Sequence, residues 1–246
     1  MPEAPEPTVF HITHWKSGSQ WVRAILREAA PDRYIRVASD LSNLKEGEFR
    51  PGSVYTPVYL PTYGLRKFVP SPENERRFII IRDLRDTLVS WYFSVKHSHD
   101  ATDTEVARTV VPYRTRFNEC SEEEGLLIAI HERMGPIADI QRSWLPSGDL
   151  VIRYEDMLDD EHLAFEQIFK HCGFDLPDSQ RREIVNRYSF ESQSGRKRGD
   201  EDVAAHHRKG IAGDWKNHFT PLVKSEFKSK FGEILKLTGY EADDCW

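Results

Sequence analysis

The chain of 246 residues is 39% hydrophobic, 11% aromatic and 30% charged, a composition typical of a globular domain that excludes a disordered or fibrous protein. Its net charge of −6 at pH 7 excludes a surface that attracts nucleic acid or anionic membranes, so any basic site must be local. No apolar run reaches the length of a membrane span, and three distant cysteines without a CxxC pair favour the reducing cytoplasm over a disulfide scaffold or a metal site.

The chain opens with a predicted strand, a tight turn and a helix. Residues 8–13 are rich in β-forming side chains and predict the first strand. The small, polar residues 14–20 predict a turn. Residues 21–29 place apolar side chains at the spacing of one helical face, and Pro31 cannot continue that helix. A second strand is expected within residues 34–38.

Another strand, loop and helix follow a proline-rich region. Residues 43–77 hold five prolines and predict mostly loop, with a β-like segment over residues 53–60. Residues 78–81 are continuously apolar, which is typical of a parallel strand buried on both faces. The apolar pattern that follows predicts a helix through Val95, on which three polar side chains share one face: Ser90, Ser94 and His97.

The rest of the chain continues the alternation of helices and strands. Its predicted elements are a mobile polar flap over residues 98–120, a helix over 122–140, a buried strand over 150–152, a helix over 163–172 capped by Gly173, a loop over 191–210 and a last helix over 222–235 that Gly239 closes. Such alternation implies a parallel sheet with helices on both faces, in which ligands bind beyond the carboxyl ends of the strands. We expect one domain over residues 8–246, after a disordered lead-in over residues 1–7.

The turn between the first strand and the first helix is suited to binding an anion. Backbone N–H groups and the helix dipole attract negative charge at a helix N-terminus. Gly18 allows a close backbone approach, Lys16 adds a positive charge, and Ser17 and Ser19 add hydroxyls. The nucleoside triphosphatase pattern GxxxxGK[ST] is absent. The alternative is a plain turn with an exposed lysine.

A second segment begins where the strand over residues 78–81 ends. Arg82 stands at the carboxyl end of that strand, where a bidentate contact to an anion would be useful. Ser90 lies on the helix that follows. The alternative is a network of ion pairs among neighbouring charges: Arg82, Asp83, Arg85 and Asp86.

A third segment runs from Arg208 to Thr220. Its basic pair, Arg208 and Lys209, precedes Gly210, a pattern that suits phosphate capture. Further glycines and two aromatic residues suggest a loop that folds over a ligand. The alternative is a solvated basic loop.

Together, these segments resemble the PAPS-dependent sulfotransferases of the cytosolic type, where PAPS is 3′-phosphoadenosine 5′-phosphosulfate. In that family a Lys-Ser-Gly loop before a Trp binds the 5′-phosphosulfate, and residues 16–21 match it, with Ser and Gln where threonines are usual. In the same family, an Arg after a strand and a Ser eight residues later bind the 3′-phosphate. Arg82 and Ser90 match this pair in residue type and spacing. The signature RKGxxGDWKNxFT stands intact over residues 208–220.

The resemblance extends from about residue 8 to residue 220. Residues 154–157 resemble the family's YEDM motif, and residues 188–190 resemble its adenine-side Thr-Ser-Phe. The resemblance to the family implies a P-loop-like, three-layer α/β fold. The donor-binding residues that it implies are Lys16, Ser17, Gly18, Ser19, Gln20, Trp21, Arg82, Ser90, Tyr154, Ser189, Phe190, Arg208, Lys209 and Gly210. Core packing is the alternative for the two that would flank the adenine, Trp21 and Phe190.

The activity that the resemblance implies is in-line transfer of a sulfuryl group from PAPS to a hydroxyl or amine of a small-molecule acceptor, releasing PAP without a metal. Lys16 would stabilise the leaving phosphate. The family's histidine base is replaced by Tyr59, a weak candidate because its ordinary pKa is about 10. Asp40 and His97 are the stronger candidates, each with an alternative role: a turn cap for Asp40 and a solvated helix end for His97. A catalytically silent PAPS- or PAP-binding protein and a P-loop-like kinase are the alternative functions.

The sequence leaves the acceptor and the oligomeric state open. The family's dimer motif is partly present, since Lys216 and Thr220 fit it but Pro221 and Ser225 do not. A monomer or a homodimer is therefore expected, with no nucleic acid or membrane partner. Residues 43–76 and 97–120 are expected to line the acceptor pocket, and their aromatic members include Tyr55 and Phe117.

Overall fold

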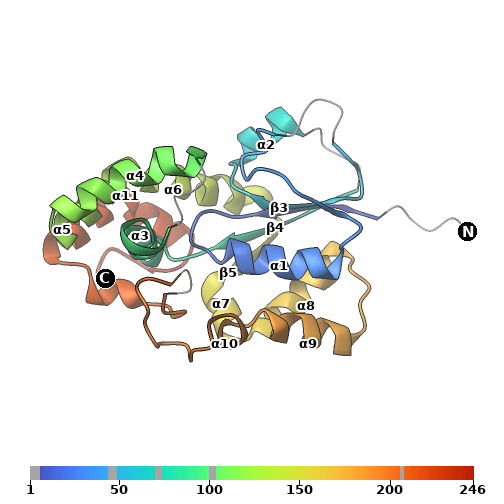
Figure 1. Ribbon diagram of the computed structural model, residues 1–246. Coiled ribbons are helices and arrows are strands. Elements are labelled where there is room, and N and C mark those ends of the chain that lie inside the picture. Colours follow the sequence, from blue (N-terminus) through green and yellow to red (C-terminus); the bar gives the residue numbers. More distant parts are fainter. Residues whose placement is uncertain (1–5, 44–48, 70–73, 100–103, 206–207) are drawn as a thin grey trace, which may run out of the picture. The chain divides into compact units, whose positions relative to one another are not determined.

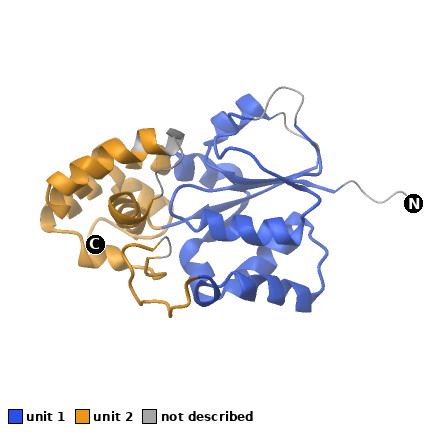
Figure 2. Cartoon of the chain, in the orientation of Figure 1, with its two compact units in different colours: residues 1–82, 139–193 blue, residues 83–138, 194–246 orange. Residues whose placement is uncertain are grey.

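A computed structural model describes residues 6–43, 49–69, 74–99, 104–205 and 208–246. Residues 1–5 of the expected lead-in, and parts of the expected loops and flap (44–48, 70–73, 100–103 and 206–207), lie outside the described residues. The chain divides into two compact units (Figure 2). We call residues 1–82 and 139–193 the sheet unit, and residues 83–138 and 194–246 the helical unit.

The sheet unit is built on parallel strands. Within the described residues these strands are β1 (Thr8–Ile12), β2 (Tyr34–Ile35), β3 (Val54–Val58), β4 (Glu75–Ile81) and β5 (Leu150–Arg153), in the order β2-β3-β1-β4-β5. The predicted strands are thus confirmed, although β2 is shorter than expected and β4 begins before its apolar run. Phe78, Ile79, Ile80 and Ile81 are all buried, because β4 is covered on both faces.

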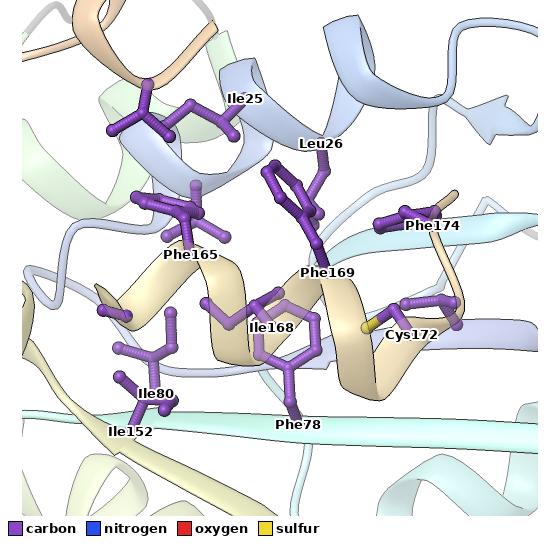
Figure 3. Packing of buried hydrophobic residues seen from close by; sticks show 14 of the residues in the cluster. Ile25, Leu26, Phe78, Ile80, Ile152, Phe165, Ile168, Phe169, Cys172 and Phe174 are labelled. Atoms are coloured by element: carbon purple, nitrogen blue, oxygen red, sulfur yellow. The ribbon is translucent and has the colours of Figure 1, made fainter. Parts of the chain in front are cut away.

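Helices cover the sheet on both sides. They are α1 (Ser19–Ala29), α2 (Thr62–Phe68), α7 (Tyr154–Asp159), α8 (Glu161–Cys172), α9 (Asp178–Arg187) and α10 (Phe190–Ser194), with a 3-10 turn, η2 (Leu145–Ser147). Figure 1 shows α8 and α9 on one side of the sheet and α2 on the other. The main core cluster packs Phe165 and Phe169 of α8 against Leu26 of α1 and Ile80 of β4 (Figure 3). The predicted α/β fold with a flanked parallel sheet is confirmed, but α2 lies where only loop was expected.

The helical unit contains α3 (Leu84–Phe93), a π-helix η1 (Ser94–Ser98), α4 (Thr104–Glu119), α5 (Glu122–Glu132), the first turn of α6 (Met134–Trp144), a 3-10 turn η3 (Asp214–Asn217) and α11 (Pro221–Leu237). Two predictions are wrong here. The expected flap is helix α4 over most of its length, because Val110 and Phe117 bury one face of it. The helix expected over residues 122–140 is two helices, because Pro136 has no N–H to bond the Glu132 carbonyl. No helix of the described residues is long and apolar enough to span a membrane.

Candidate functional site

The turn before α1 has the backbone of an anion-binding nest. Lys16 and Gly18 both adopt left-handed conformations, with φ of 67° and 79°. Alternation of such residues turns successive N–H groups toward one point. The described residues provide no side-chain cap for α1 and no acidic residue in its first turn. The positive end of this helix dipole is therefore left for an anion to neutralise.

Gly18 also meets a close neighbour. A Cβ atom at this position would lie 2.9 Å from Cε2 of Tyr154, so any other residue would force the ring to shift and would also strain the left-handed backbone. The Tyr154 ring lies against the turn and stacks with the guanidinium of Arg82, whose Cζ is 4.5 Å from the ring centroid. Arg82 Nη1 donates to the Lys16 carbonyl at 2.7 Å. The structure thus brings together four of the residues that were predicted to bind the sulfuryl donor: Lys16, Gly18, Arg82 and Tyr154.

The two serine hydroxyls of the turn differ in their surroundings. Ser17 is buried, and its hydroxyl donates to the His14 carbonyl at 2.6 Å and contacts the Thr13 hydroxyl. The Ser17 side chain therefore stabilises the turn. Ser19, the first residue of α1, has its hydroxyl 2.6 Å from the hydroxyl of Tyr59.

Sequence reasoning missed a buried pair behind the turn. The Gln141 amide of α6 donates to Nε2 of His14 (2.8 Å) and to the Arg82 carbonyl (2.7 Å), while His14 Nδ1 donates to the Trp15 carbonyl (2.9 Å). Burial lowers the pKa of His14 to about 4, so its ring is neutral and can accept the amide hydrogen. A lone amide between buried Ile140 and Trp144 was the signal that could have identified Gln141.

The residues expected near the adenine lie at the edges of helices. Trp21 packs its ring edge-on against Phe165, 5.5 Å between centroids, as the core-packing alternative expected. The Ser189 hydroxyl caps α10 by accepting from Ser192 N–H at 3.3 Å. Phe190 is half-buried at the first position of that helix, and Gln20 is exposed on α1.

The basic pair of the third segment is held by carboxylates in the helical unit. Arg208 donates to Asp214 and Glu201, and Lys209 Nζ lies 2.7 Å from Asp214 Oδ1. The Arg208 side chain is 13% exposed, which makes the alternative of a solvated loop wrong. Burial opposes ionisation of Asp214, but hydrogen bonds from His218, Lys209 and Arg208 outweigh it and lower the pKa of this carboxyl group well below its usual range.

The two acidic residues that follow β4, Asp83 and Asp86, have different partners. Asp83 accepts from Arg85 Nη2 at 2.7 Å, so the alternative of an ion-pair network holds for this pair, and Glu241 also binds Arg85. Asp86 instead accepts from the backbone N–H groups of Gly213 (2.6 Å) and Trp215 (2.9 Å). The side chain of Asp86 therefore orders the glycine-rich part of the signature.

The expected common face of Ser90, Ser94 and His97 is not formed. Ser94 begins the π-helix, whose wider turns change the register, as the bond from His99 N–H to the Ser94 carbonyl shows. Ser94 is buried, Ser90 is half-buried and His97 is exposed, with the His97 ring stacked on Phe93. This correction removes the periodicity argument for His97 but leaves its predicted role untested.

The base candidate Asp40 lies in an exposed turn. Its Oδ1 accepts from the backbone N–H of Ser42 at 3.0 Å, which is the turn-capping role considered as its alternative. Tyr55 and Phe117, expected to line an acceptor pocket, are core residues with no exposed surface. Among the described residues, no group of three or more His, Cys, Asp or Glu side chains could hold a metal ion.

His218 gives the helical unit a pH-dependent contribution to stability. Its Nε2 lies 3.3 Å from Asp214 and its Nδ1 lies 2.6 Å from Glu122, and these bonds raise the pKa of the imidazole although burial opposes them. The contribution is full below the ordinary pKa of about 6.5 and is lost as pH rises through the raised folded-state value. Wild type is expected to exceed His218→Gln by about 1.5 kcal/mol in unfolding free energy at pH 6, and by less at pH 9. Denaturant titrations at both pH values measure this difference, and an equal difference at both would contradict the assignment.

A parallel sheet whose first strand leads through a backbone nest into an uncapped helix defines an α/β protein with a candidate anion-binding site. Residues 6–239 match the sulfotransferase domain family. The chain therefore belongs to the sulfotransferase family. The predicted family and enzyme class, a PAPS-dependent sulfotransferase, are thereby confirmed.

The chain is similar to several known sulfotransferases over most of its length. Sulfotransferase 2A1 of Homo sapiens is 30% identical over 239 residues, which cover 91% of this chain and 77% of that protein. Sulfotransferase 1 family member D1 of Mus musculus is 24% identical and the match covers 93% and 83%. Mouse sulfotransferase SULT7A1 complexed with PAP superposes with a TM-score of 0.67 at 22% identity, covering 96% of this chain and 90% of that chain. Retinol dehydratase in complex with androsterone and PAP gives 0.62 at 17% identity, covering 96% and 82%.

Proposed function

We propose that this sulfotransferase moves the sulfuryl group of PAPS to a hydroxyl of a small, largely apolar acceptor. The observation that carries the proposal is the nest of Lys16 and Gly18 at the uncapped start of α1, backed by Arg82 and Tyr154. The names of similar proteins support an apolar alcohol, because they include a 3-alpha-hydroxysteroid sulfotransferase of Cavia porcellus and a retinol dehydratase bound to androsterone.

The sheet unit supplies the groups for the 5′ side of the donor. The backbone N–H groups of residues 17–20 would bind the 5′-phosphosulfate, and Lys16 would neutralise the charge that develops on the leaving phosphate oxygen. The acceptor oxygen forms its bond to sulfur as the bond to that phosphate oxygen breaks. Tyr154, Ser189 and Phe190 are proposed at the adenine, with Trp21 supporting them from the core.

The resemblance to the family supports five residues for binding the 3′-phosphate: Arg82, Ser90, Arg208, Lys209 and Gly210. Glu201 and Asp214 now neutralise the basic pair, and Glu201 is the more exposed of the two carboxylates, so a phosphate would replace Glu201 first. A ligand without a 3′-phosphate cannot replace Glu201 at this basic pair. The clamp therefore favours PAPS over ATP.

The general base is proposed to be His97 or Asp40. Partial desolvation by neighbouring groups, then the charges of Lys96 and Arg114, lower the pKa of His97 although much of its side chain is exposed, and this keeps the imidazole neutral and able to accept a proton at pH 7. Asp40 already accepts a hydrogen bond from Ser42. We therefore rank His97 first.

Calorimetric titration with adenosine 3′,5′-bisphosphate, ADP and ATP tests the function. The bisphosphate is expected to bind at least tenfold more tightly than ATP, because the 3′-phosphate adds charge-assisted bonds worth about 1.5–3 kcal/mol each in favourable cases. Equal or tighter binding of ATP would contradict the proposal and favour a kinase. Tight bisphosphate binding without transfer from PAPS to any hydroxylated acceptor would favour a silent binding protein.

Location, assembly and domain organisation are further parts of the proposal. A cytoplasmic location agrees with the cytosolic sulfotransferase of Danio rerio among the similar proteins. Thr220 of the partial dimer motif caps α11 by accepting from Val223 N–H at 3.3 Å, and Pro221 is its first residue. This local role accounts for Thr220 without requiring a dimer, and we propose that the protein is a monomer or a homodimer. We also propose that residues 8–246 form one domain.

A further inference from the structure

The hydroxyl of Tyr59 meets the first residue of α1. Tyr59 lies just after β3, and its hydroxyl oxygen is 2.6 Å from that of Ser19, a residue only 6% exposed. Two contacts hold the tyrosine in place. Its backbone N–H donates to the Ser39 carbonyl at 2.6 Å, and its ring packs against the Trp15 ring with centroids 4.9 Å apart. The pair of hydroxyls thus lies at the helix N-terminus that we assign to the phosphosulfate.

The direction of this hydrogen bond decides what Ser19 can do. Each hydroxyl carries one hydrogen, so one hydrogen remains after the pair has formed its own bond. A phenol is a stronger donor than an aliphatic hydroxyl, and burial is the largest influence on the pKa of Tyr59 and raises it. The phenol therefore stays protonated at neutral pH, and of the two directions open to this bond we assign the phenol as the donor and the Ser19 hydroxyl as the acceptor. The hydrogen of Ser19 is left to donate to an anion.

We infer that Tyr59 is a positioning residue that aims the Ser19 hydroxyl at the 5′-phosphosulfate, and is not the general base. The inference rests on the proposed function, because it takes the anion at α1 to be the sulfuryl donor. An anion that accepts from Ser19 also polarises the bond from Tyr59, so the two bonds strengthen each other. Tyr59 thus serves donor binding at the position where the family's histidine would serve the acceptor.

Titration of the full chain with adenosine 3′,5′-bisphosphate and adenosine 3′-monophosphate tests this inference, because the second nucleotide has no 5′-phosphate. Tyr59→Phe and Ser19→Ala are each expected to weaken bisphosphate binding about five- to tenfold, the value of one hydrogen bond, and to leave the 3′-monophosphate unchanged. The double variant is expected to bind no more weakly than Ser19→Ala alone, because Tyr59 acts through Ser19.

Two further variants serve as controls. Ser19→Thr keeps the hydroxyl and is expected to recover most of the bisphosphate affinity that Ser19→Ala loses. Tyr63→Phe removes an exposed phenol that donates to Asp139 at 2.6 Å, and is expected to change neither titration.

Several outcomes would overturn the inference. One is full additivity in the double variant, and another is an equal loss for both nucleotides. A third is unchanged bisphosphate binding in Tyr59→Phe together with a kcat more than a hundredfold lower, which would make Tyr59 the base. Failure of the proposed function is a separate result, because the wild-type chain would then bind ATP as tightly as the bisphosphate.

Discussion

Lys16→Ala is expected to lower kcat for sulfuryl transfer about 10²- to 10³-fold, because one oriented donor is worth about 3–4 kcal/mol where charge develops in the transition state. The backbone of Lys16 is left-handed, a conformation that costs a non-glycine residue about 1–3 kcal/mol and persists where the surrounding structure enforces it. The bond from Arg82 to the Lys16 carbonyl is part of that enforcement. Single-turnover transfer from PAPS to a hydroxylated acceptor measures the effect.

Binding and rate separate the role of Lys16 from that of the 3′-phosphate clamp. Affinity for adenosine 3′,5′-bisphosphate is expected to fall less than about tenfold in Lys16→Ala, because the 3′-phosphate contacts remain. Lys170→Ala, which removes an exposed lysine near the end of α8, is the matched control and should behave as wild type. A kcat for Lys16→Ala within threefold of wild type would show that the transferred group does not depend on this side chain.

The local parts of the site could be predicted from sequence because they depend on neighbours along the chain. A β-rich segment, a short polar turn and an amphipathic helix with a proline beyond its end are sufficient to place the nest of Lys16 and Gly18 before α1. The break between α5 and α6 was also present in the sequence, as Pro136. It was missed because apolar residues continue on both sides of it and maintain the helical pattern.

The supporting contacts could not be predicted, because each joins polar residues far apart in the chain. Gln141 reaches His14 across 127 positions, and Asp86 reaches the Trp215 N–H across 129. Periodicity identifies which face of a helix is buried, but it does not identify the backbone group that a buried polar side chain will find. The π-helix after Phe93 is a similar case, since no residue type marks it and it changes which side chains share a face.

Asp86→Ala is expected to lower the unfolding free energy by about 3 kcal/mol, because it leaves the Gly213 and Trp215 N–H groups without their acceptor, at about 1–3 kcal/mol each. Asp86 is 2% exposed, so water does not readily replace the carboxylate. In a chain of this size the change corresponds to a fall in Tm of about 6–12 °C. Thermal unfolding followed by circular dichroism measures it.

The same substitution is expected to weaken binding of adenosine 3′,5′-bisphosphate about tenfold, because Gly213 and Trp215 flank Asp214, the residue that positions Arg208 and Lys209. Asp86→Asn keeps a carbonyl that can accept one of the two N–H groups, so its losses should be about half as large in free energy. Asp159→Ala removes an exposed carboxylate at the end of α7 and is the matched control. A Tm for Asp86→Ala within 2 °C of that control would show that the signature loop is ordered by other contacts, and would remove Asp86 from the account of 3′-phosphate binding.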